Sequence, residues 1–104
     1  MVRYWASRLL VMAGIALAFS IGATYAAEDK IDPEILEMTV AEWGRLNLFV
    51  RGEHIDLYAT DFSFNSEQRL AFHACLIGAA AHPQTRHWTF RRAARQCVMH
   101  ARSQ

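Results

Sequence analysis

The first 26 residues are typical of an export leader, and removing them leaves only 78 residues to build a folded domain. Arg3 and Arg8 precede the uncharged run LLVMAGIALAF, and no acidic residue occurs before Glu28. This order of a basic region and an apolar region is that of a signal peptide. Thr24 and Ala26 place small side chains where a signal peptidase would require them for a cut after Ala26. We therefore predict a signal peptide at 1–26.

An uncleaved membrane anchor is the alternative interpretation of the same segment. The residues from Leu9 to Ala27 carry no charge, and a membrane span needs about 20 such residues. Ser20, Gly22 and Thr24 weaken the end of the stretch, and no stop-transfer pattern follows. We expect cleavage, with a mature domain at 27–104 that is periplasmic or secreted. Retention would instead make the chain a membrane-anchored small subunit of an envelope complex.

Two cysteines, Cys75 and Cys97, remain in the mature chain and lie 22 residues apart. A domain this small buries only about 60–65% of its unfolded surface, and exported domains of this size commonly need a covalent link. Alanine and glycine lie one helical turn from Cys75, and alanines accompany Cys97, so two helices could approach closely there. A disulfide is the prediction. The alternative is a metal-handling site in which Cys75, Cys97 and His100 act as ligands.

Hydrophobic periodicity predicts an all-α fold, a small three-helix bundle with a disulfide-linked helical hairpin. A first amphipathic helix is expected from Pro33 to near Arg51, with Asp32 as its N-cap and Gly52 as its stop. A second helix follows the capping-box pair Asn65 and Gln68 and runs over SEQRLAFHACLIGAAA. It is apolar almost all round, which predicts a central position in the bundle.

The third helix is expected from Arg86 to about Ala101, with Thr85 as its N-cap and an apolar face centred near Cys97. The segment from Glu53 to Phe64 resists assignment. It is compatible with a short helix or an irregular turn, and its aromatic residues are expected to close one end of the bundle.

The charges of the mature chain are strongly divided. Removal of Arg3 and Arg8 changes the formal net charge from +1 to −1, which does not support a nucleic-acid-binding surface. All ten acidic residues lie between Glu28 and Glu67, whereas residues 68–104 contain six arginines and no acid. One interpretation is that the acidic first helix packs on the basic third helix. The other is that the third helix presents a basic face to an external partner. The residues of that face are Arg91, Arg92, Arg95 and Arg102, with Trp88 at its edge.

Motifs for catalysis are missing from the sequence. It contains no GxSxG, CxxC, HExxH or phosphate-binding glycine loop, and a disulfide would occupy both thiols. We therefore expect no enzymatic activity, no cofactor and no small-molecule substrate. The leading hypothesis is a small exported binding or accessory protein, such as an inhibitor, a chaperone or an immunity-like factor. Its partner would be an acidic protein surface or anionic envelope lipid.

Overall fold

The computed structural model describes residues 25–104, and the predicted leader, apart from Tyr25 and Ala26, lies outside the described residues. Helices account for 71% of the described part, and no strand occurs in it. The elements are η1 (Ala26–Lys30), α2 (Pro33–Glu37), α3 (Val40–Trp43), α4 (Leu48–Asp61), α5 (Ser66–Ala81) and α6 (Phe90–Arg102). The predicted helical fold is therefore confirmed at the level of fold class.

The predicted helix from Pro33 to Arg51 is wrong, because the chain breaks twice within it. Thr39 has an extended backbone and forms a capping box with Glu42, which starts the separate helix α3. Asn47 then caps the backbone N–H of Val50 and starts α4. Each of these side chains satisfies an orphan N–H of a new helix, and this local gain competes with continuation of the old one. Gly52, the expected stop, lies inside α4.

The segment from Glu53 to Phe64, for which the sequence predicts no single structure, is largely helical. Helix α4 continues to Asp61, and the chain leaves it through Ser63, whose φ of 52° lies in the left-handed region. Phe62 and Phe64 follow as a stacked pair with ring centroids 6.0 Å apart, and Phe64 also packs on Phe72 of α5. The two rings are partly buried and pack against the core.

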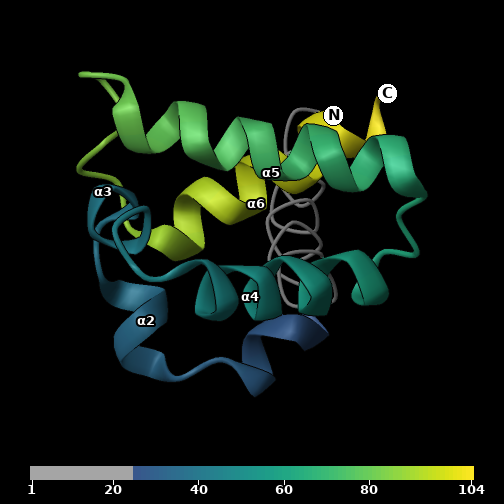
Figure 1. The fold of residues 1–104 in the computed structure, drawn as a ribbon, viewed down its shortest axis with the longest axis horizontal. Helices are drawn as coiled ribbons and strands as arrows, with labels where there is room; N and C mark the ends of the chain where they lie inside the picture. Colours follow the sequence, from purple (N-terminus) through teal and green to yellow (C-terminus); the bar gives the residue numbers. More distant parts are fainter. Residues whose placement is uncertain (1–24) are drawn as a thin grey trace, which may run out of the picture.

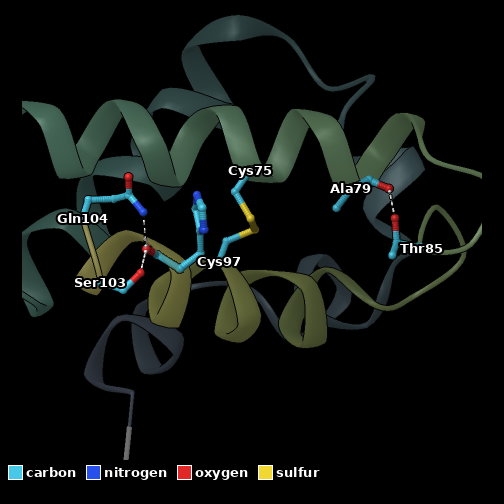
Figure 2. The surroundings of a disulfide bond; sticks show 7 residues. Cys75, Ala79, Thr85, Cys97, Ser103 and Gln104 are labelled. Carbon is cyan, nitrogen blue, oxygen red and sulfur yellow. Dashed lines mark hydrogen bonds between the residues drawn. A yellow bond between two sulfur atoms is a disulfide. The ribbon is translucent and has the colours of Figure 1, made fainter.

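Helices α5 and α6 run antiparallel as neighbours and form a hairpin (Figure 1). Helix α5 begins at the predicted capping box and ends before His82, as expected. Helix α6 begins later than predicted, because Thr89 rather than Thr85 caps it. Thr85 instead donates its hydroxyl hydrogen bond to the carbonyl of Ala79 at 2.7 Å, which anchors the turn to the end of α5 (Figure 2).

The disulfide between Cys75 and Cys97 joins the two helices of this hairpin, and the prediction of this bond is confirmed. The Cα atoms of the pair lie 5.6 Å apart, within the usual range for a disulfide. Figure 2 shows the bond crossing directly from α5 to α6. Its position near the middle of both helices fixes their separation and register.

Helix α6, and not α5, is the central helix. Six of its residues are buried, namely Phe90, Ala93, Ala94, Cys97, Val98 and Ala101, whereas α5 buries only Phe72 and Leu76. The prediction of a central α5 is therefore wrong. Helix α5 also leaves two large apolar side chains exposed, Leu70 at 65% and Ile77 at 39%. The apolar face predicted around Cys97 is correct.

Aromatic side chains from four elements fill the core. Trp43 stacks on Phe90 with ring centroids 4.8 Å apart, and Tyr58 lies against both Phe72 and Phe90. His54 is also buried, and its Nδ1 accepts a hydrogen bond from the indole N–H of Trp43 at 2.9 Å. The core therefore ties α3 and α4 to the α5–α6 hairpin.

A short antiparallel contact fixes the start of α6. The backbone N–H of Val40 donates to the carbonyl of Trp88 at 2.8 Å, and that of Phe90 donates to the carbonyl of Met38 at 2.7 Å. The two N-cap residues, Thr39 and Thr89, thus face each other across one β-bridge. This bridge determines where Trp88 and the first arginines of α6 are placed.

Candidate functional site: the basic face of helix α6

The four arginines predicted to bind a partner lie on α6, and the structure does not leave them as one open cluster. Arg91, Arg92 and Arg95 occupy its first two turns, and Arg102 is its last residue. Two of them contact acidic residues and two contact aromatic rings without an ion pair in the described chain. The pairing of each arginine decides what it can offer to another molecule.

Arg95 and Arg91 are engaged by acidic residues from the N-terminal part of the domain. Arg95 donates two hydrogen bonds to the carboxylate of Glu28, at 2.9 and 2.7 Å. Arg91 pairs with Glu37 and lies 3.9 Å from Glu28. Two of the four arginines of the predicted basic face are therefore engaged inside the domain, where they hold η1 and α2 against α6.

Glu28 is the centre of this network. Its side chain is only 11% exposed, and the hydroxyl of Tyr58 also donates to it, at 3.4 Å. Burial raises the pKa of Tyr58 above its ordinary value, and the Glu28 carboxylate adds to that effect. The hydrogen bonds that Arg95 donates to Glu28 raise the pKa of Arg95, because they favour the charged guanidinium.

Arg92 and Arg102 have aromatic neighbours and no ion pair among residues 25–104. The guanidinium carbon of Arg92 lies 3.9 Å from the ring centroid of Trp88, which is a close cation–π stack. The corresponding distance from Arg102 to Phe62 is 5.6 Å. Arg92 is exposed and Trp88 is half-buried, so the stack presents both a positive charge and an apolar edge.

Two hollows flank the Arg92–Trp88 stack. One has a volume of about 290 Å³ and lies along the basic side of α6. It is lined by Thr89, Arg91, Arg92, Arg95, Gln96 and Met99. The other, of about 370 Å³, lies between α5 and α6 over the disulfide. It is lined by Cys75, Gly78, Ala79, His82, Thr85, Trp88, Ala93, Gln96 and Cys97.

The hollow between α5 and α6 was not predicted from the sequence. Small side chains on the facing turns of α5 and α6 leave it open, and Trp88 closes one side. Gln96 lines both hollows, so they adjoin on α6. The small residues around the cysteines predict a close approach of the two helices. The same residues also leave an apolar space beside the bond.

The alternative metal site loses its principal ligands in this structure. Both cysteine sulfurs are bonded to each other, so neither is available as a thiolate. Within residues 25–104, no group of three histidine, cysteine or acidic side chains is placed to share a metal ion. Across that same range, no helix combines the length and apolar character needed to cross a membrane.

No protein family, curated protein or solved structure matches the chain.

Proposed function

We propose that this chain is a small, exported, non-enzymatic binding protein that captures an acidic segment of a partner protein on helix α6. The role of such a protein would be that of an inhibitor, a chaperone or an immunity-like accessory factor. The observation that carries the proposal is the Arg92–Trp88 stack. It places an arginine with no carboxylate partner in the described chain between a basic hollow and an apolar one.

The two hollows favour a segment that combines a carboxylate with an apolar side chain. The carboxylate would pair with Arg92, whose guanidinium can donate two parallel hydrogen bonds. The apolar side chain would enter the hollow between α5 and α6, where burial is favourable by roughly 25 cal/mol per Å². Arginine and tryptophan are also enriched among the residues that dominate binding energy at interfaces.

The disulfide supports binding rather than a mobile or catalytic role. Cys75 and Cys97 line the apolar hollow and join its two walls covalently. A site held open in the free protein loses less conformational entropy when a partner binds. The disulfide also suits an oxidising compartment, which agrees with the export leader predicted at 1–26.

The test is affinity capture from envelope extract with the chain that starts at Ala27, at low and at high salt. We expect a partner that is retained at low salt and lost at high salt, because exposed charges are screened within about 10 Å at 0.1 M. Arg92→Gln and Trp88→Ala should each lose this partner. Lys30→Gln removes the same charge from a residue that lies beside Leu57 and Thr60 of α4 and lines neither hollow, and this variant should retain the partner.

Two outcomes would overturn the proposal. Capture that is insensitive to salt would show that the arginine does not carry the interaction. Capture of the same protein by the wild type, by Arg92→Gln and by Trp88→Ala would show that the partner binds elsewhere. Circular dichroism of each variant separates loss of binding from loss of fold.

A further inference from the structure

A second cationic hollow lies at the end of the molecule where α3, the start of α4 and the end of α5 meet (left in Figure 1). Its volume is about 330 Å³. It is lined by Ala41, Gly44, Arg45, Arg51, Ile77, Ala80, Ala81 and Arg86. It shares no lining residue with the two hollows on α6.

The three arginines of this hollow are unpaired within the described chain. Arg45, Arg51 and Arg86 form no ion pair with a carboxylate of residues 25–104, whereas Arg91 and Arg95 do. No acidic residue lines the hollow. The three come from a loop, a helix and a turn that are up to 41 positions apart in sequence. The fold therefore concentrates positive charge in a hollow whose lining contains no carboxylate.

Arg51 adds a second and independent observation. Its Nε is buried and has no hydrogen-bond partner among the described residues. Buried donors are almost always paired, so a free one at the wall of a hollow indicates a missing acceptor. The charge of Arg51 also reaches His73, where it adds to burial in lowering the pKa of that imidazole.

Two large apolar side chains protrude from the start of α4, the helix that carries Arg51. Leu48 is 68% exposed and Phe49 is 86% exposed. Both belong to the first turn of α4, between Arg45 and Arg51 in sequence, and Leu48 lies one turn from Arg51 on the helix surface. Exposed aromatic and aliphatic side chains flanked by arginines are typical of surfaces that lie in the interfacial region of a bilayer.

We propose that this end of the domain binds the surface of an anionic lipid bilayer. The arginines of the hollow hold lipid phosphate groups, and Leu48 and Phe49 enter the boundary between headgroups and acyl chains. A lipid surface accounts for both the arginines and the exposed apolar side chains. It supplies dense negative charge and an apolar layer a few ångströms beneath that charge. The domain then docks on a membrane with one end and leaves the α6 face free for its protein partner.

The test measures co-sedimentation of the chain from Ala27 with two kinds of vesicle. All core residues of the described structure lie between Ala27 and Ala101, so this chain contains the whole core, and the apolar leader cannot contribute. Vesicles of phosphatidylglycerol with phosphatidylethanolamine should bind the protein, and vesicles of phosphatidylcholine alone should not. Binding to the anionic vesicles should fall as salt rises.

Matched variants assign the binding to this end of the molecule. Arg45→Gln and Arg86→Gln should each weaken it roughly fivefold, since an arginine near an anionic surface contributes about 1 kcal/mol. Phe49→Ser should weaken it more. Leu70→Ser removes a comparably exposed apolar side chain, 65% exposed on α5, and should have no effect. Arg92→Gln removes an unpaired arginine on α6 and should also have no effect.

The proposal is overturned if both vesicle types bind the protein equally. It is also overturned if Arg92→Gln loses binding while Arg45→Gln keeps it, which would place lipid on the α6 face instead. Self-association that Phe49→Ser abolishes, without any vesicle binding, would assign the patch to a second copy of the chain. Because the two sites have separate residues, this result is independent of the capture experiment for α6.

Discussion

Reduction of the disulfide between Cys75 and Cys97 is expected to remove a large part of the stability of the domain. The bond closes a loop of 22 residues. On the chain-entropy estimate, a cross-link of that span raises the free energy of unfolding by about 3.4 kcal/mol, since it restricts the unfolded chain. A domain of this size typically has a total of roughly 4–12 kcal/mol. The reduced protein should therefore be marginally folded or largely unfolded.

The assay is urea denaturation of the chain from Ala27, followed by circular dichroism, with and without a reductant. Reduction removes no heavy atom, so it isolates the cross-link better than a substitution of Cys97, which is buried. A double Cys75→Ala, Cys97→Ala variant should be insensitive to the reductant and serves as the control. A loss smaller than about 1 kcal/mol on reduction would refute the entropic argument, because packing between α5 and α6 would then hold the hairpin alone.

Two further predictions concern the core and the helix contacts. Burial lowers the pKa of His54 in the folded state below its ordinary value of 6.5. As the pH falls, His54 is therefore protonated more readily in the unfolded chain than in the folded one, which favours unfolding. Thermal stability should fall between about pH 7.5 and pH 5.5, and His54→Gln, whose amide oxygen can still accept the hydrogen bond from Trp43, should flatten that fall. A Cβ at Gly44 would lie 3.1 Å from the Cβ of Ala80, whereas one at Gly52 would meet nothing within 4 Å. In denaturant titrations, Gly44→Ala should destabilise the domain. Gly52→Ala should instead raise the free energy of unfolding by about 0.5–1 kcal/mol. Equal effects of the two substitutions would contradict the close approach of α3 and α5.

The features predicted correctly are those that depend on neighbours in sequence. The capping box of Asn65 and Gln68 satisfies two backbone donors by contacts three residues apart, so it can be recognised without the fold. The end of α5 before Pro83 follows from the steric effect of proline on the preceding residue. The disulfide was predictable because two cysteines in a small chain with a predicted export leader have only each other as partners.

The first predicted helix is wrong because capping side chains interrupt the helix at two positions. Thr39 with Glu42, and Asn47 ahead of Val50, carry the signature of helix starts inside an apolar pattern that runs through both. A capping side chain offers the backbone an alternative hydrogen bond, so it can end one helix and begin another without a glycine. The bridge between Thr39 and Thr89 then holds the break open.

The sequence by itself determined the helical class, the cross-link, the caps of α5 and the separation of positive from negative charge. These follow from local backbone chemistry and from composition. Only the tertiary structure decided which charges remain available. Arg91 and Arg95 face Glu28 and Glu37 across more than 50 positions, whereas Arg45, Arg51 and Arg86 gather around a hollow that no acidic residue lines. A direct ion pair needs its charged atoms within about 4 Å of each other, so the packing of the helices decides which arginines are paired inside the domain and which remain unpaired.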